Sequence, residues 1–455
     1  MNALKMKNHI DTNMDYVVIG HGTAGQTAAA VLKKVDPESN VTVIEKGIHV
    51  AIHPCSLPMV LSGKLSPQDI EERVPRGKVD ILLRSEAKKI DRERKIVYFI
   101  RDGTQESIHY DKLILATGLS PIIPKIEGMD LEGVGTVWNL ETVSELLKYL
   151  GNRVVVVGGS ATGIEVASEL ASTGRDVTLI EAMEQLMPGK VDPPISSMVM
   201  NSLNDLGVKV MLKAPMERLE GSGGKLTHVV TPKGRIEADT AIIVIGAKPN
   251  VEVALNSGLV IGETGGVKVD EYMFTSDQDI LAAGDVAEVK DFVSGKPTLT
   301  GLASTALVQG RIAAENAAGG KTRYLGALSP FLVSVGDYLF GGVGLSATRA
   351  DSLKMEYKAF RFSGSDLPKY MPGKDNTVIW LITDRKGKLL GGQVFGRRGV
   401  RERILFLTAA IYAGFSVEDI RIMEFAYQPE VCDVLEPIAI AAEGMFRKYL
   451  LRSED

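Results

Sequence analysis

Cysteine is nearly absent from this chain, which has two cysteines, Cys55 and Cys432, among its 455 residues. Two cysteines so far apart give neither a disulfide framework nor a CxxC zinc pattern, and they fit a reducing intracellular setting. The chain also has no apolar run of about 20 residues, the length that spans a bilayer. We therefore expect a cytoplasmic protein that is not inserted in a membrane.

An excess of positive charge is missing too. The chain has 52 lysine and arginine residues against 57 aspartate and glutamate residues, a formal net charge of −5. This balance argues against nucleic acid or an anionic membrane as the main partner. No metal-ligand spacing accompanies the histidines, so no metal site is predicted. Residues 1–14 are polar and lack the apolar segment of a secretory signal, so we expect an N-terminal extension there.

What the sequence does have is a glycine-rich motif near its start. Gly20, Gly22 and Gly25 follow an apolar run at residues 16–19 and open an alanine-rich helical pattern. Glu45 ends the next apolar run, 20 residues after Gly25. This is the separation expected between the last glycine of a dinucleotide-binding motif and an acid that binds ribose hydroxyls. The glycines let the backbone touch a pyrophosphate, which the helix N-terminus attracts.

The same pattern occurs again, 138 residues further along the chain. Gly158, Ser160 and Gly163 follow an apolar run at residues 154–157, and Glu181 ends the next run, 18 residues after Gly163. Ser160 replaces the middle glycine and adds only a small side chain. The offset is too long for a solenoid repeat, so the motifs indicate two separate dinucleotide-binding domains of the α/β class.

Further apolar runs end in glycine. One ends at Ala116-Thr117-Gly118, another at Gly246, and a third leads into Ala283-Gly284-Asp285. A long helical stretch then begins near Leu302. From Gly326 onward the pattern changes to alternating, strand-like runs followed by helical segments, with no nucleotide motif. This tail is predicted to be an α+β domain.

Together these motifs resemble the two-dinucleotide-binding-domain flavoproteins, the glutathione-reductase-like class, over nearly the whole chain. The resemblance implies that the first motif binds FAD, with Asp285 on the ribityl chain, and that the second binds NAD(H). It implies an FAD domain at 15–120 and 251–325, an NAD(H) domain inserted at 121–250, and a dimerisation domain at 326–455. The implied cofactor-binding residues are Gly20, Gly22, Gly25, Glu45, Lys46, Ala116, Thr117, Gly118, Gly158, Ser160, Gly163, Glu165, Glu181, Gly246, Gly284, Asp285, Leu302 and Ala303.

The segment around Cys55 narrows the resemblance. Cys55-Ser56-Leu57-Pro58 contains a single cysteine, because the position five residues after Cys55 is Val60 rather than the second cysteine of a CxxxxC pair. A single cysteine followed by x-Leu-Pro is similar to the coenzyme A-disulfide reductase, NADH oxidase and persulfide reductase group.

The C-terminal tail resembles the same group. Residues 369–373, which include Tyr370, resemble its tyrosine-rich turn, and residues 426–429, which include Tyr427, resemble the start of its C-terminal motif. The resemblance implies a homodimer in which both tyrosines enter the active site of the partner subunit.

The implied reaction has two halves. NADH passes a hydride to flavin, and reduced flavin then cleaves a disulfide or persulfide between Cys55 and a small thiol. Because the thiolate is the nucleophile, the protein is expected to lower the pKa of Cys55, and Pro58 can start a helix whose N-terminus favours the anion. Glu181 predicts NADH rather than NADPH, because a carboxylate binds a ribose hydroxyl and repels a 2′-phosphate.

The implied small thiol is coenzyme A or a related compound. The substrate-binding residues that the resemblance assigns are Lys34, Ser56 and Arg311. Three polar residues of the coenzyme A-disulfide reductases are replaced here, by Val31, Pro54 and Leu307. Coenzyme A is therefore only the leading candidate among small thiols.

Other interpretations stay open at this point. A lone cysteine is ordinarily a small core residue, and a helix first turn favours an acid such as Glu165 for its own sake. An NADH oxidase would cycle Cys55 through sulfenic acid while it reduces O2. A third function is a flavoprotein reductase that passes electrons to a protein carrier such as a ferredoxin.

Cys432 stands where the group usually has serine. We hypothesise that it approaches the partner's Cys55 in the implied dimer, where the two would form a disulfide or share a substrate. The simpler interpretation is an unreactive thiol.

Overall fold

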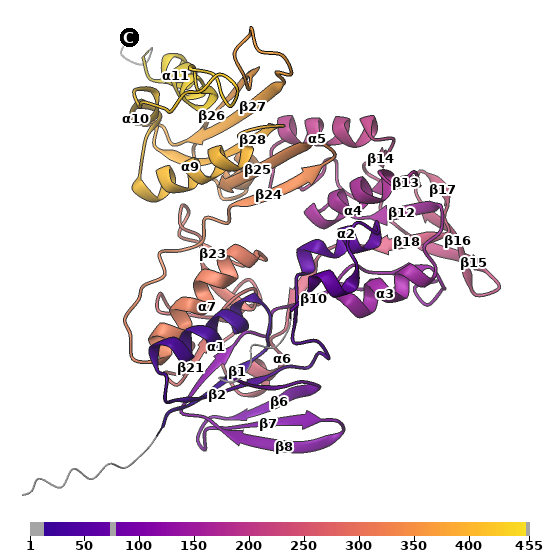
Figure 1. Ribbon diagram of the computed structural model, residues 1–455, viewed down its shortest axis with the longest axis vertical. Coiled ribbons are helices and arrows are strands. Elements are labelled where there is room, and N and C mark those ends of the chain that lie inside the picture. Colours follow the sequence, from indigo (N-terminus) through magenta and orange to yellow (C-terminus); the bar gives the residue numbers. More distant parts are fainter. Residues whose placement is uncertain (1–12, 73–78, 452–455) are drawn as a thin grey trace, which may run out of the picture.

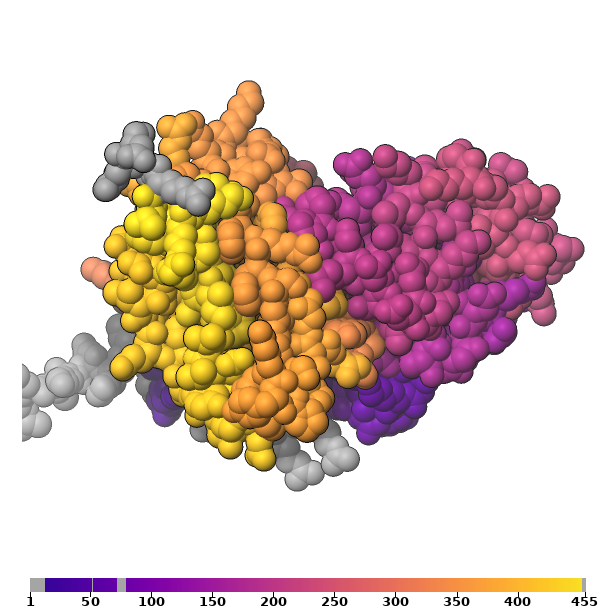
Figure 2. All heavy atoms as spheres, turned by 90° about the horizontal axis from the view of Figure 1, so that it is seen from above, coloured from indigo at the N-terminus to yellow at the C-terminus, as the bar shows by residue number. Residues whose placement is uncertain are grey.

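The computed structural model describes residues 13–72 and 79–451, so most of the predicted N-terminal extension lies outside the described residues. Figure 1 shows three units, each built on a five-stranded sheet. Seen from above in Figure 2, the third unit (orange to yellow) lies beside the second (magenta), and part of the first (indigo) shows beneath them. Within the described ranges, no helix is long and apolar enough to cross a membrane.

The first sheet is parallel and has the strand order β21-β9-β1-β2-β5. Its strands are β1 (Asp15–Ile19), β2 (Asn40–Ile44), β5 (Asp80–Leu82), β9 (Lys112–Leu115) and β21 (Ile280–Ala282). The strands are apolar runs because both faces of the sheet are covered. β21 enters this sheet from a part of the chain that follows the whole second unit, as an inserted domain requires.

Two helices of the first unit pack against each other, α1 (Thr23–Val35) and α7 (Ala303–Ala317). A Cβ on Gly310 would lie 2.4 Å from the carbonyl oxygen of Ala24, so the helices approach this closely only because Gly310 has no side chain. An antiparallel meander lies at the opposite end of the unit in Figure 1, made of β6 (Ser85–Asp91), β7 (Ile96–Arg101) and β8 (Thr104–His109).

The second sheet is also parallel, in the order β11-β18-β12-β13-β14. Its strands are β11 (Val134–Gly135), β12 (Arg153–Val157), β13 (Asp176–Ile180), β14 (Lys209–Met211) and β18 (Thr240–Ile243). Its helices are α3 (Leu140–Lys148), α4 (Ala161–Ala171) and α5 (Pro193–Asp205). A second meander follows α5 and consists of β15 (Arg218–Ser222), β16 (Lys225–Thr231) and β17 (Gly234–Glu237).

The chain leaves the first unit and returns to it at one place. Here β10 (Leu119–Pro121) pairs antiparallel with β19 (Ala247–Pro249). The Thr117 hydroxyl donates to the carbonyl oxygen of Asn250 over 2.7 Å, and the Asn250 amide donates back to the carbonyl oxygen of Thr117 over 2.8 Å. The arrangement suits an inserted unit, and the boundaries at 120 and 250 stay predictions.

The third unit carries the predicted α+β tail. Its sheet is antiparallel, in the order β24-β25-β28-β27-β26. The strands are β24 (Phe331–Val335), β25 (Tyr338–Gly344), β26 (Lys358–Ser365), β27 (Asn376–Thr383) and β28 (Leu389–Gly396). The helices are α8 (Ala347–Ser352), α9 (Val400–Ala413), α10 (Val417–Arg421) and α11 (Pro437–Tyr449).

The remaining elements are short and belong to the first unit and to the segment around Cys55. They are β3 (Ala51–Ile52), a 3₁₀ turn (Pro54–Ser56), α2 (Leu57–Leu61), a second 3₁₀ turn (Pro67–Ile70), β4 (Glu71–Glu72), α6 (Glu252–Asn256), β20 (Val267–Lys268), β22 (Ala287–Lys290) and β23 (Pro297–Thr298).

A buried carboxylate joins the second unit to the third. Asp192 precedes α5 and is fully buried. It accepts hydrogen bonds from the backbone N–H groups of Ala347 and Thr348 over 2.9 and 3.0 Å, and from the Gln393 side-chain amide over 2.8 Å. Because a buried carboxylate needs such donors, these hydrogen bonds connect the second unit to the third.

Candidate active site

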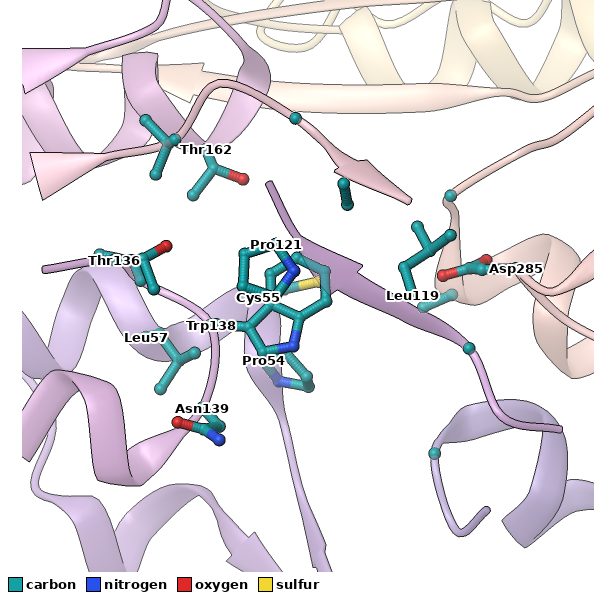
Figure 3. Close-up of a pocket in the computed structure, with 18 of the residues that line it drawn as sticks. Pro54, Cys55, Leu57, Leu119, Pro121, Thr136, Trp138, Asn139, Thr162 and Asp285 are labelled. Carbon is teal, nitrogen blue, oxygen red and sulfur yellow. The ribbon is translucent and has the colours of Figure 1, made fainter. Parts of the chain in front are cut away.

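A cavity of about 1370 Å³ opens where the three units meet. Its lining comes from both glycine motifs, the segment around Cys55, the start of α7 and the start of β24. Figure 3 shows Cys55 and Asp285 among the lining residues. Of the residues predicted to bind cofactors, all line this cavity except Gly25 and Gly163.

The first glycine motif is shaped by close backbone contacts. Gly20 has a φ of +99°, and a Cβ there would lie 2.3 Å from the carbonyl oxygen of Ala116. A Cβ on Gly25 would lie 1.9 Å from the carbonyl oxygen of Gly20, so this position sets the approach of α1 to the loop. The Cβ position of Gly22, in contrast, has no described atom within 4 Å and faces the cavity. That opening lets a phosphate approach the backbone.

The second motif repeats this geometry. A Cβ on Gly158 would lie 2.5 Å from the carbonyl oxygen of Val244, and one on Gly163 would lie 2.0 Å from the carbonyl oxygen of Gly158. Ser160 caps α4, since its hydroxyl accepts a hydrogen bond from the backbone N–H of Gly163 over 3.3 Å. The same hydroxyl donates to the carbonyl oxygen of Val244 over 3.2 Å. The serine therefore keeps the loop shape and adds a helix cap.

The two strand-end acids hold the loops. Glu45 accepts hydrogen bonds from the backbone N–H groups of His21 and Gly47, over 2.7 and 2.6 Å. Glu181 accepts from those of Gly159 and Met183, over 2.7 and 2.8 Å. Each carboxylate oxygen has a second lone pair, so both acids can still accept a ribose hydroxyl.

The surroundings of the Asp285 carboxylate show whether the first unit can hold FAD. Its side chain faces the cavity, yet its Oδ1 atom is buried and has no hydrogen-bond partner among the described residues. Burial raises the pKa of Asp285, and the backbone N–H of Leu302, just before α7, partly offsets this. A buried carboxylate oxygen without a donor is costly, and a sugar hydroxyl would satisfy it. The residues present therefore fit a ribityl chain.

Cys55 lies in the 3₁₀ turn that leads into α2, and its side chain is exposed to the cavity. The predicted lowering of its pKa is wrong. The surrounding protein removes enough water to raise the pKa of the thiol, and the charge of Glu165 raises it further. The backbone N–H of Cys55 lowers the pKa by less than either of these, and the charge of Asp285 adds the smallest rise. The predicted helix start is present, since α2 begins at Leu57 with Pro58 in its first turn, yet burial and the charge of Glu165 set the direction of the shift.

Glu165 lines the same cavity from the second turn of α4. Burial raises its pKa to about 7, against a hydrogen bond from the backbone N–H of Ser334, and the charge of Glu169 adds to the rise. A carboxyl group with this pKa exchanges its proton near neutral pH. Its role next to the nicotinamide stays a prediction.

The predicted substrate-binding residues are not brought into the cavity. Lys34 on α1 and Arg311 on α7 are exposed, and neither they nor Ser56 line it. Their predicted contact with coenzyme A stays a prediction, because it depends on groups outside this cavity.

The two predicted tyrosines lie together on the third unit. The hydroxyls of Tyr370 and Tyr427 are 2.9 Å apart. The exposed fraction is 71% for Tyr370 and 44% for Tyr427. Within one chain they do not line the cavity.

The thiol of Cys432 donates weakly to the carbonyl oxygen of Ala426 over 3.5 Å. Its proposed approach to the partner's Cys55 stays a hypothesis.

Trp138 and Lys190 are among the cavity residues that sequence reasoning missed. Trp138 comes just before α3, and Lys190 ends a turn between Glu181 and α5. Neither belongs to a glycine motif. The one sequence signal was Pro188-Gly189, which marks a turn but not its position over the second loop.

Known proteins resemble this chain along its length. Residues 14–310 match the pyridine nucleotide-disulphide oxidoreductases, and residues 332–437 match the dimerisation domain of that family. An NADH oxidase of Methanocaldococcus jannaschii is 35% identical, over 96% of this chain and 99% of its own. An NAD(P)H coenzyme A polysulfide/persulfide reductase of Pyrococcus horikoshii is 31% identical, over 94% of this chain and 97% of its own.

Solved structures of related flavoproteins have the same fold as this chain. A NAD-dependent persulfide reductase from A. fulgidus gives a TM-score of 0.92 at 31% identity, covering 96% of this chain and 84% of that one. A water-forming NADH oxidase from Lactobacillus brevis, bound to NADH, gives a TM-score of 0.92 at 26% identity, covering 96% of this chain and 99% of that one.

The fold and the site define a flavoprotein reductase with two dinucleotide-binding units and a dimerisation domain. The chain belongs to the pyridine nucleotide-disulphide oxidoreductases, which use FAD and NADH. The resemblance inferred from the motifs is confirmed, and the protein is an NAD(P)H-dependent flavoprotein oxidoreductase.

Proposed function

We propose that the protein uses NADH to reduce a disulfide or persulfide that a small thiol forms with Cys55. The observation that carries this proposal is the exposure of the Cys55 thiol in the cavity that both dinucleotide motifs line. The named persulfide reductases among its relatives support it. Bound FAD supplies the two-electron chemistry between a pyridine nucleotide and sulfur.

The sulfur step needs one cysteine of the protein. The Cys55 thiolate attacks one sulfur of a disulfide RSSR, which gives a Cys55–S–S–R mixed disulfide and releases RS⁻, and this anion takes up a proton. Two electrons and one proton then cleave the mixed disulfide, release the second RSH and restore the thiolate. The substrate sulfur takes the place of a second protein cysteine.

NADH is the proposed electron donor because of Glu181. Glu181 directly follows β13, where a dinucleotide places the ribose hydroxyls, and a negative charge there repels a 2′-phosphate. The NADH-bound oxidase with the same fold supports this choice.

We also propose a homodimer as the working form. The match to the dimerisation domain supports it, as does the exposure of Tyr370 and Tyr427, which do not line the cavity of their own chain. Coenzyme A is the first small thiol to test, because relatives are named for it.

Cys55→Ser tests the proposal. The variant should lose NADH oxidation with coenzyme A disulfide or polysulfide by about a hundredfold or more, since serine cannot form a mixed disulfide. It should keep FAD and keep electron transfer from NADH to ferricyanide, which needs no thiol. Full disulfide reduction by the variant would refute the proposal.

NADH oxidase is the second candidate, favoured by the 35% identical relative of that name. Oxygen uptake measured beside NADH oxidation separates the two. One O2 consumed for every one or two NADH at full rate, with slow disulfide reduction, would assign the oxidase function.

A further inference from the structure

Carboxylates dominate the ionisable lining of the cavity. Seven acidic residues line it: Glu45, Glu86, Glu141, Glu165, Glu181, Glu252 and Asp285. Among the described residues of the lining, only two carry a full positive charge, Lys46 and Lys190. Because FAD and NADH are anionic through their diphosphates, these two lysines are the side chains that can offset that charge.

The two lysines are divided between the two motifs. Lys46 follows Glu45 directly in the first unit. Lys190 is attached to the second loop through a turn, since the backbone N–H of Met187 donates to the carbonyl oxygen of Gly159 over 2.9 Å, and that of Lys190 donates to Met187 over 3.1 Å. Met187 and Gly189 both have positive φ, +46° and +75°, which folds the turn back over the loop.

Lys190 has no counter-ion of its own. Within the described residues it forms no ion pair, although its side chain is exposed to the cavity. Although Lys190 is open to the cavity, the protein around it displaces enough water to lower its pKa, and the charge of Arg349 lowers it further, against a smaller effect of Asp291. A bound anion would therefore stabilise this ammonium group.

We propose that Lys190 binds the diphosphate of the pyridine dinucleotide held by the second glycine motif. The turn that carries Lys190 is bonded to Gly159, in the loop where the backbone meets a diphosphate. In this arrangement the ribose 2′-hydroxyl binds to Glu181, whose negative charge disfavours a 2′-phosphate at that position. The inference rests on NADH binding at this motif and is independent of the reaction at Cys55.

Binding of NAD⁺ to the FAD-loaded, oxidised protein tests the proposal by isothermal titration calorimetry. Lys190→Gln should raise the Kd for NAD⁺ and for ADP-ribose by about tenfold or more, the effect of losing one hydrogen bond to a charged group. Lys190→Arg should stay within about threefold of the wild type, because it keeps the charge. FAD content should not change in either variant.

Lys213→Gln is the matched control. Lys213 is an exposed lysine of the same unit, paired with Glu184, and does not line the cavity. Its variant should bind NAD⁺ as the wild type does. In stopped-flow reduction by NADH, Lys190→Gln should raise the half-saturating NADH concentration and leave the limiting rate within about twofold.

Two results would overturn the proposal. One is an unchanged Kd for NAD⁺ and ADP-ribose in Lys190→Gln. The other is weaker binding of NADP⁺ alone, which would place Lys190 at a 2′-phosphate instead. Because the binding assay contains no sulfur substrate, its outcome does not depend on the function proposed for Cys55.

Discussion

The negative charge of Glu165 raises the pKa of the Cys55 thiol across the cavity that both residues line. Burial is the larger cause of that rise, and it also raises the pKa of Glu165 to about 7. Protonation of Glu165 therefore removes one of the causes that hold the pKa of Cys55 high.

Glu165→Gln should make Cys55 more reactive. Without the carboxylate charge the thiol pKa falls, and the thiolate fraction below that pKa rises by about three- to tenfold. The rate of alkylation of Cys55 by iodoacetamide measures this. The gain should be largest above about pH 7, where wild-type Glu165 is ionised, and should fade below it.

Glu141→Gln is the control for this experiment, because Glu141 lines the cavity but is not a cause of the shift at Cys55. It should leave the alkylation rate unchanged. Equal or slower alkylation of Glu165→Gln above pH 7 would show that the two groups are not coupled.

Glu165→Gln should also stabilise the protein at alkaline pH. The pKa of Glu165 is about 7 in the folded protein against an ordinary value of 4.5, so the folded state holds the proton more tightly and loses stability as pH rises from 4.5 to 7. The loss reaches about 3 kcal/mol above pH 7. Glu165→Gln should therefore raise the Tm at pH 8 and have little effect near pH 4.5. An equal change in Tm at both values would contradict this assignment.

The parts of the site that depend on local sequence were predictable. Gly20, Gly25 and Glu45 have a fixed spacing because a strand, a tight turn and a helix must follow one another within one unit. The structure places them as expected, with Gly25 against the carbonyl oxygen of Gly20. The α+β tail could likewise be predicted from its change of pattern.

Electrostatic effects between units were not predictable. The pKa of Cys55 depends on Glu165, which is 110 positions away in the sequence and lies on α4 of the second unit. The helix start at Pro58 is a local signal, and it predicted the wrong sign of the shift. The position of Lys190 in the cavity could not be predicted for the same reason, because only tertiary packing brings its turn onto Gly159.

Glu181→Gln should weaken the preference for NADH. Removing the charge removes the repulsion of a 2′-phosphate, so kcat/KM for NADPH should rise by about tenfold, while kcat/KM for NADH falls through the loss of one acceptor. Glu184→Gln, an exposed neighbour outside the cavity, is the control and should change neither value. A wild-type protein that already prefers NADPH would contradict this role of Glu181.

Asp192→Ala should loosen the contact between the second and third units. It leaves the N–H groups of Ala347 and Thr348 and the Gln393 amide without their acceptor, at a cost of about 3 kcal/mol. Thermal unfolding should show a lower Tm. Asp205→Ala, at the exposed end of α5, should leave the Tm within about a degree. Equal stability of both variants would mean that Asp192 does not hold these units together.

The mass of the Cys55 peptide tests the central claim most directly. Protein incubated with a small disulfide without NADH, then quenched in acid and digested, should carry one substrate thiol on Cys55. That added mass should disappear within one turnover when NADH is added. An unmodified Cys55 peptide in a sample that goes on to reduce the disulfide at full rate would contradict the account.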